Sequence, residues 1–371
     1  MFEIDVALRT MIEREGSDLH VKVGAPPTAR IHGELVPLEG YGPLSPHDTE
    51  GAFQQIAEPR SLEEFQVNGE ADYSYSIPGL SRFRVNTFKQ RGSISIVCRA
   101  IPFKIRTVEE LGLPPVVTKL AEEQRGIILV TGTTGSGKST TLAAMIDHIN
   151  TTRHQHIVTL EDPIEYLHED KHSIVNQREV GSDTESFARA MKRVLRQDPD
   201  VILIGEMRDE ETVRTALSAA ETGHLVLSTV HTLDATETIN RIIDFFPPHL
   251  QHQSRVMLAA TLKGAIAQRL VPDITGDGRV PASEVMVVTG RVQDLILNPE
   301  ETGKITEVIA EGEFYGMRTF DQALLGYVME GKVSEQVALD YASSPHDFKL
   351  MLAAGGQRAS GIEQLAGSSA E

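Results

Sequence analysis

The stretch from Ile127 to Leu142, which reads IILVTGTTGSGKSTTL, constrains the fold more than any other part of this sequence. An apolar run leads into Gly132-Thr-Thr-Gly-Ser-Gly-Lys-Ser139, which matches G-x-x-x-x-G-K-[ST] in full, and a run with helical character follows at once. A strand before this pattern and a helix after it are the context that a phosphate-binding loop requires. The sequence therefore predicts a strand, a nucleotide-binding loop and a helix in direct succession.

Each part of this loop fits the chemistry of binding a triphosphate. Glycines permit a sharp turn and leave no Cβ between the backbone N–H groups and the phosphate oxygens. Lys138 would place a positive charge at the β and γ phosphates, and the Ser139 hydroxyl would bind Mg²⁺. The alternative is a glycine-rich turn without a ligand; the fixed spacing, the Lys-Ser pair and both flanks argue against it. The residues expected to hold ATP are Gly132, Thr133, Thr134, Gly135, Ser136, Gly137, Lys138, Ser139 and Thr140.

The segments around the loop alternate between strand and helix patterns, which predicts an α/β fold with a mainly parallel sheet. Ligands of such folds bind at the carboxyl ends of the strands. The expected strands are residues 127–131, 156–160, 201–204 and 225–230, and the expected helices between them are residues 139–150, 184–196 and 209–221.

The flanking regions show other patterns. Residues 1–100 combine a helical pattern at 3–14 with a hairpin pattern and a three-strand meander pattern between residues 71 and 99, and so predict a separate α+β domain. A linker at 101–115, an ATPase core at 116–275, a C-terminal helical region at 276–354 and a disordered tail at 355–371 are expected to follow. A helix is also expected over residues 251–269.

Two acidic residues follow expected strands and are candidates for catalysis and for metal binding. Glu206 ends the apolar run VILIG and is the candidate base that orients the attacking water. Gly205 occupies the place where an aspartate is usual, so Mg²⁺ would depend on Ser139, Glu206 and further carboxylates such as Glu161. Glu161 directly follows the expected strand at 156–160 and is expected beside the phosphate loop; the alternative is a solvated turn that stops at Pro163.

Basic residues offer further candidates, although each has a purely structural alternative. His231 follows the expected strand at 225–230, where it could contact the γ-phosphate, or it could be a satisfied structural histidine. Arg82, Arg84 and Arg99 lie on expected strands of the first domain, where they could form a solvated face. Alternatively, they could reach a phosphate of a neighbouring subunit, because arginine is the usual charge stabiliser in ATP hydrolysis.

Composition limits the other possibilities. The formal net charge of −18 argues against a general nucleic-acid binder. The single cysteine, Cys98, cannot form an internal disulfide or a cysteine-based metal cluster and is expected to be a core residue in a reducing cytoplasm. No apolar run approaches the length of a membrane span, so we expect only peripheral contact with a membrane.

Six segments together resemble the type IV pilus retraction ATPases, the PilT/PilU group of secretion ATPases. They are GTTGSGKST, LEDPIEY, VNQREVG, RQDPDVILIGEMRD, AAETGHLVLSTVHT and GMRTFDQAL, and SDLH and RFRVN near the start fit as well. The resemblance covers the chain to about residue 354. It implies a PAS-like N-terminal domain, a RecA-like ATPase core and a hexameric ring that hydrolyses ATP with Mg²⁺ to pull pilin subunits out of the pilus.

The resemblance also assigns roles and partners. Glu206 corresponds to the catalytic glutamate, Glu161 to the acidic box, and His224 and His231 to the histidine box. Arg82, Arg84 and Arg99 correspond to arginines that complete the site of the next subunit. The implied partners are five further copies of the chain, an inner-membrane pilus platform protein and a paralogous pilus ATPase, at the cytoplasmic face of the inner membrane.

Several functional alternatives stay open. Residues 290–296 read GRVQDLI where the group usually carries Ala-Ile-Arg-Asn-Leu-Ile, so the chain could be the principal or the accessory retraction ATPase. Extension and secretion ATPases of the same superfamily typically carry another N-terminal domain and often four zinc-binding cysteines, and neither is expected here. A nucleic-acid translocase would be expected to show a basic module, and a non-hydrolysing subunit would not need Lys138, Ser139 and Glu206.

Overall fold

The computed structural model describes residues 2–101, 104–276 and 278–354, so the tail expected at 355–371 lies outside the described residues. The chain divides into two compact units, Met1–Lys104 with Pro163–Leu167 and Ile105–Asp162 with His168–Glu371. Each unit is described by itself. Among the described helices, none is long and apolar enough to cross a membrane.

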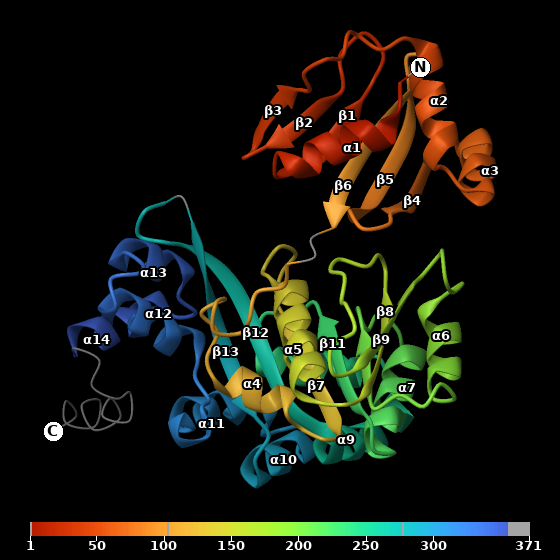
Figure 1. The fold of residues 1–371 in the computed structure, drawn as a ribbon. Helices are drawn as coiled ribbons and strands as arrows, with labels where there is room; N and C mark the ends of the chain where they lie inside the picture. Colours follow the sequence, from red (N-terminus) through yellow and green to blue (C-terminus); the bar gives the residue numbers. More distant parts are fainter. Residues whose placement is uncertain (1, 102–103, 277, 355–371) are drawn as a thin grey trace, which may run out of the picture. The chain divides into compact units, whose positions relative to one another are not determined.

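The first unit is an antiparallel sheet of six strands with three helices, as the α+β pattern predicts (Figure 1). The strand order is β3-β2-β1-β6-β5-β4. Its strands are β1 (Gly16–Val21), β2 (Thr28–Ile31), β3 (Glu34–Pro37), β4 (Glu70–Ile77), β5 (Ser81–Gln90) and β6 (Ser93–Ile101), and its helices are α1 (Ile4–Glu13), α2 (Pro46–Ile56) and α3 (Pro59–Asn68).

Alternation along β5 explains how this sheet is covered. Phe83 and Val85 are buried in a core that also receives Leu8 of α1 and Phe53 of α2, while Arg84 between them is exposed. Cys98 belongs to the same core, and burial raises the pKa of its thiol to about 12, which fits an unreactive packing residue. The sequence analysis did not anticipate α2 and α3.

The second unit is built on a sheet of seven strands in the order β13-β12-β7-β11-β10-β8-β9. All neighbouring strands from β12 to β9 are parallel, and β13 alone runs antiparallel at one edge. The strands are β7 (Gly126–Thr131), β8 (His156–Glu161), β9 (Ile174–Glu179), β10 (Val201–Ile204), β11 (Leu225–Val230), β12 (Leu262–Pro272) and β13 (Arg279–Val287).

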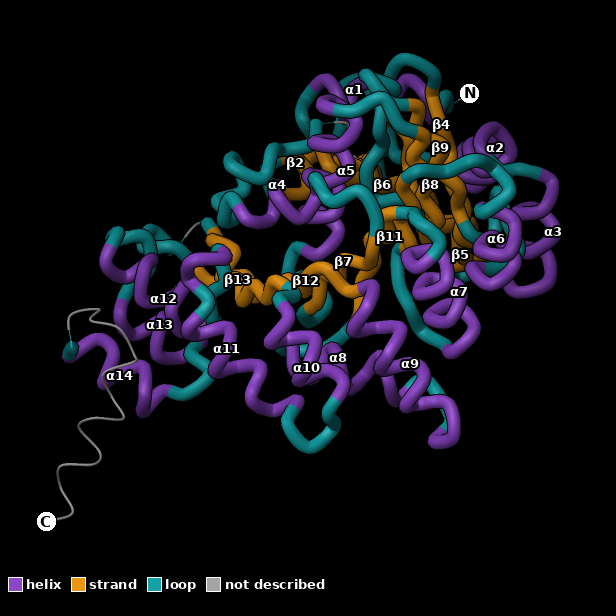
Figure 2. The backbone as a smooth tube through the Cα atoms, turned by 90° about the horizontal axis from the view of Figure 1, so that it is seen from below, coloured by secondary structure: helices purple, strands orange, loops and turns teal. Residues whose placement is uncertain are grey.

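Helices cover both faces of this sheet, which is why β7 is apolar from Ile127 to Val130. Ile127 and Leu129 point into a core shared with α7 (Glu210–Glu221), whereas Ile128 and Val130 point into a core shared with α5 (Lys138–Thr152). Figure 2 shows the two helical layers on opposite sides of β7 and β12. The remaining helices around the sheet are α4 (Val116–Ala121), α6 (Phe187–Val194), α8 (Ala235–Asp244), α9 (Pro248–Thr261), α10 (Gly290–Leu297) and α11 (Ile305–Glu311).

The helix expected over residues 251–269 is wrong beyond Thr261, because the chain enters β12 at Leu262. Pairing decides this, since β12 is hydrogen-bonded to β7 on one side and to β13 on the other. Gly264 permits the close contact: a Cβ there would lie 2.8 Å from the Leu120 side chain and 2.9 Å from the Met286 carbonyl. The core boundary expected at residue 275 consequently falls inside this hairpin, and β13 belongs to the ATPase sheet.

A small helical cluster follows the sheet. In Figure 1 the last helices lie together beside the β12–β13 hairpin, and Phe320, Leu324 and Phe348 bury themselves against Val271 of β12. The expected linker at 101–115 also differs from the structure, since Val108 and Leu113 are buried in the second unit. The last helices are α12 (Phe320–Met329), α13 (Glu335–Tyr341) and α14 (Pro345–Ala353), and single 3₁₀ turns span Thr302–Lys304 and Glu313–Tyr315.

Candidate nucleotide site

The loop between β7 and α5 adopts a conformation that only glycine tolerates at its first position. Gly132 has φ +138°, and a Cβ there would lie 2.5 Å from both the Gln268 carbonyl oxygen and Ser136 Oγ. Gly135 and Gly137 also have positive φ, at +78° and +92°. The loop thus folds tightly against β12, with Thr133, Thr134 and Gly135 exposed at its tip.

The N-terminus of α5 is left open for an anion. Its N-cap is Gly137, which has no side chain to accept a bond from the first N–H groups. By contrast, α6, α7 and α8 are capped by Ser186, Asp209 and Asp234. Four orphan N–H groups and the positive end of the helix dipole therefore face the loop, which is the arrangement that binds phosphate.

Lys138 and Ser136 also suit a loop that binds phosphate. The ammonium of Lys138 donates to the carbonyls of Gly132 at 2.8 Å and of Thr133 at 3.0 Å, so the lysine is held within the loop. Ser136 is 3% exposed, and its hydroxyl has no hydrogen-bond partner among the described residues. A buried hydroxyl without a partner indicates that a ligand or solvent atom belongs there. Ser139, the expected magnesium ligand, is half-buried on the first turn of α5.

Glu206 follows β10, and the backbone of Gly205 just before it is held on both sides. The N–H of Gly205 donates to the Leu160 carbonyl at 2.7 Å, and the Thr229 hydroxyl donates to the Gly205 carbonyl at 2.6 Å. A Cβ at residue 205 would lie 3.3 Å from the Leu160 oxygen, a close approach that favours glycine over the usual aspartate. Because β10 is the second strand from β7, Glu206 lies about 10 Å along the sheet from the phosphate loop.

His231 and Arg208 both contact Glu206. The Nε2 atom of His231 lies 3.4 Å from Glu206 Oε1, and an Arg208 guanidinium nitrogen lies 2.7 Å from Glu206 Oε2. His231 directly follows β11, the strand between β7 and β10, so it lies on the path from the loop to Glu206. Sequence reasoning missed Arg208; its signal is the basic residue two positions after the candidate base. The pKa of Arg208 is raised by its hydrogen bond to Glu206.

Glu161 was expected beside the phosphate loop. It lies at the same edge of the sheet as the loop but not next to it. It ends β8, and β11 and β10 intervene between β8 and β7. At about 5 Å per strand, Glu161 is on the order of 14 Å from the loop along the sheet. Its carboxylate accepts hydrogen bonds from the Thr159 hydroxyl at 2.7 Å and the Gln177 amide at 3.1 Å. If Glu161 contacts the metal, it would therefore do so from the same side of the phosphate loop as Glu206.

The structure does not bring His224 to this edge, in contrast to the expectation that it binds the cofactor. His224 precedes β11, and its carbonyl accepts the N–H of Gly126 at the start of β7. The two strands are parallel, so His224 lies at the amino edge while the phosphate loop lies at the carboxyl edge. Its ring nitrogen Nδ1 is 2.9 Å from the Ala219 carbonyl, a contact that closes the end of α7.

The three arginines of the first unit gather on one face of its sheet. Arg82 and Arg84 are two residues apart on β5 and so share a face, and Arg99 of β6 pairs directly opposite Arg84. Arg99 is 69% exposed and forms a 2.8 Å ion pair with Asp18, while Arg84 is exposed and Arg82 half-buried. This face points away from the core that holds Phe83.

The described residues hold no group of three or more histidine, cysteine, aspartate or glutamate side chains placed to bind a metal. A parallel sheet with a phosphate loop, an open helix N-terminus and a carboxylate two strands away is the architecture of P-loop ATPases with a RecA-like core. The fold class predicted from the sequence is therefore confirmed.

Comparisons with known proteins narrow this class. The family model described as "Type II/IV secretion system protein" matches residues 73–338. "Type IV pilus retractation ATPase PilT" of Pseudomonas aeruginosa is 43% identical over 346 residues, which cover 93% of this chain and 100% of the relative. "Type IV pilus ATPase PilU" of the same organism is 41% identical, with 96% and 92% covered. The solved "Crystal Structure of the Pilus Retraction Motor PilT and Bound ADP" superposes with a TM-score of 0.86 at 44% identity, covering 95% of this chain and 100% of that one. The chain belongs to the Type II/IV secretion system protein family.

Proposed function

We propose that this protein is an ATPase motor that drives the retraction of type IV pili. The observation that carries the proposal is the open N-terminus of α5 with Glu206 at the end of a strand two places away in the same sheet, in a chain that matches a pilus retraction ATPase over 93% of its length. The fold alone would not suffice, because one fold supports many activities.

The residues of this chain would divide the chemistry among them. The loop from Gly132 to Thr140, with Lys138, would bind the triphosphate, and Ser139 would hold Mg²⁺, which neutralises charge on the phosphates. Glu206 would accept a proton from the attacking water or orient it. His231 and Arg208, both in contact with Glu206, would hold its carboxylate in position until the site is filled.

The motor would be a homohexamer in which each site is completed by its neighbour. The exposed face with Arg82, Arg84 and Arg99 supports this, because a guanidinium supplied in trans stabilises the charge that develops during phosphoryl transfer. The proposed partners are a pilus platform protein at the inner membrane and a paralogous pilus ATPase, with the ring at the cytoplasmic face. No contact with nucleic acid is proposed, given the net charge of −18.

Whether the chain is the principal or the accessory retraction ATPase is a second question, since its identities of 43% and 41% to the two relatives differ little. An extension or secretion ATPase is the other alternative.

One experiment separates these functions. The gene is deleted in its own organism, pili are imaged and twitching is measured, and the wild-type or Glu206→Gln chain is then supplied. Loss of retraction would leave many pili and no movement, rescued by the wild type alone. An accessory motor would leave partial movement. A deletion strain without pili would refute retraction and indicate extension. In a separate assay of the purified protein, a response of the ATPase rate to DNA would indicate a translocase.

A further inference from the structure

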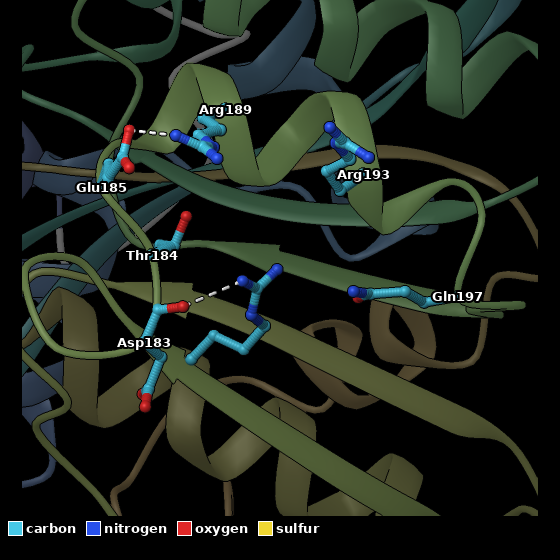
Figure 3. Close-up of a pocket in the computed structure, with 7 residues that line it drawn as sticks. Asp183, Thr184, Glu185, Arg189, Arg193 and Gln197 are labelled. Carbon is cyan, nitrogen blue, oxygen red and sulfur yellow. Dashed lines mark hydrogen bonds and ion pairs between the residues drawn. The ribbon is translucent and has the colours of Figure 1, made fainter.

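A pocket of about 480 Å³ opens in the second unit, outside the nucleotide site. We call it the arginine pocket; its lining residues are Arg178, Asp183, Thr184, Glu185, Arg189, Arg193 and Gln197. Figure 3 shows Arg189 and Arg193 on successive turns of α6, with Asp183, Thr184 and Glu185 on the loop before that helix and Gln197 beyond its end. Arg178 comes from the end of β9.

This position is remote from the phosphate loop. Four steps across the sheet separate β9 from β7, which amounts to roughly 19 Å at the usual strand spacing. The arginine pocket is therefore not a part of the site that would hold the nucleotide.

The charges in the pocket leave an excess of positive charge. Both carboxylates of the pocket already have partners. Glu185 forms an ion pair with Arg189, and Asp183 Oδ2 accepts the backbone N–H of Glu179 at 2.8 Å. Arg193 is exposed, and no acidic side chain pairs with it within residues 2–101, 104–276 and 278–354. This surplus contrasts with the net charge of −18 of the whole chain.

Arg178 gives an independent reason to expect a ligand. One of its terminal nitrogens, Nη2, donates to the Asp183 carbonyl at 3.1 Å. The other, Nη1, is buried and has no hydrogen-bond partner in the part of the chain that the structure describes. A charged N–H group removed from water without an acceptor costs free energy, so an acceptor is expected to occupy the pocket beside it.

We propose that the arginine pocket binds a compact, polyvalent phosphate anion of the pyrophosphate type as a second anion site of this protein. Guanidinium groups pair with phosphate oxygens through two parallel N–H bonds, and Arg178 and Arg193 have nitrogens to offer. The lining residues are all polar or charged, and none carries an aromatic ring that would stack on a nucleoside base.

The test is calorimetric titration of inorganic pyrophosphate, in EDTA, into the full chain carrying Lys138→Ala, which weakens binding at the phosphate loop. Arg193→Gln and Arg178→Gln are each added to this background. The matched control is Arg214→Gln, because Arg214 is an exposed arginine on a helix, as Arg193 is, but lies on α7 outside the pocket.

The Lys138→Ala chain is expected to bind one pyrophosphate. Arg193→Gln and Arg178→Gln should each weaken this binding about tenfold or more, since hydrogen bonds to charged groups contribute about 1.5–3 kcal/mol. The control should change it less than about twofold, as expected for a residue outside the site. Absence of binding to the Lys138→Ala chain would overturn the proposal, as would equal weakening by Arg193→Gln and Arg214→Gln. Because Arg193 is exposed, Arg193→Gln guards against a folding artefact, and the thermal unfolding curve of Arg178→Gln is compared with that of the parent.

Discussion

Replacing Gly132 by alanine tests the inference that the phosphate loop is folded tightly against β12. The new Cβ would lie 2.5 Å from the Gln268 oxygen and from Ser136 Oγ, and neighbours closer than 3.0 Å must shift, here by at least 0.5 Å on each side. The Gln268 oxygen belongs to the backbone of β12, which is paired with β13, so it cannot yield easily. Gly135→Ala is a matched control: its φ is +78°, but nothing lies within 4 Å of its Cβ.

The two substitutions differ in magnitude because only one combines strain with overpacking. Gly135→Ala should cost about 1–2 kcal/mol of stability, the price of a left-handed alanine. Gly132→Ala should cost about 1–3 kcal/mol for its backbone conformation and a further 1–3 kcal/mol for overpacking. At about 2–4 °C per kcal/mol for a domain of this size, the Tm should fall by roughly 4 °C for Gly135→Ala and roughly 12 °C for Gly132→Ala.

Differential scanning calorimetry of the full chain without nucleotide measures these shifts, with the transition of the larger unit followed separately. Equal shifts for the two variants would refute the reasoning, because the contact with β12 would then contribute nothing. A wild-type Tm for Gly132→Ala would refute it as well, since neither strain nor overpacking would be present at that position.

Three other predictions concern catalysis, assembly and pH. Glu206→Gln should retain ATP binding and lose turnover at least about a hundredfold, because an amide cannot take the proton of water; equilibrium binding and phosphate release measure this, and loss of both would make Glu206 a structural residue. Chains that carry both Arg82→Ala and Arg84→Ala should recover part of the ATPase activity when they are mixed with Lys138→Ala chains, because in some neighbouring pairs an intact phosphate loop then meets intact arginines. Unchanged activity in rings proven to be mixed would show that the arginines act within their own subunit. Burial raises the pKa of Glu284 from 4.5 to about 7, so the folded state binds the proton more tightly and stability should fall by about 3 kcal/mol as pH rises through that window. Glu284→Gln should remove this slope from the Tm measured between pH 5 and 8, and an unchanged slope would contradict the assignment.

The local sequence predicted those features whose causes are local. The order of glycines, Lys138 and Ser139 between an apolar run and a helical run determines the strand, the loop and α5. The run 201–204 is apolar at every position and the run 225–230 at all but Ser228 and Thr229, as suits strands covered on both faces, and the structure has strands at these residues. Caps such as Asp209 marked where helices begin.

Periodicity failed at β12 for a physical reason. Leu262–Pro272 is rich in small apolar residues that suit a buried helix as well as a buried strand. Hydrogen bonds to β7, far away in the sequence, and to the following strand β13 favour the strand. The same limit applies to Arg208, whose pairing with Glu206 depends on how the chain turns after β10.

By itself, the sequence determined that a phosphate loop begins a helix, that acidic and basic residues follow strands, and that the fold is α/β. Only the tertiary structure decided the strand order, because that order results from long-range packing and not from any local pattern. Strand order places β11 between β7 and β10, so His231 lies on the way to Glu206 while Glu161 lies a strand further away. Strand direction places His224 at the opposite edge, since parallel strands bring carboxyl ends together and leave their amino ends on the far side.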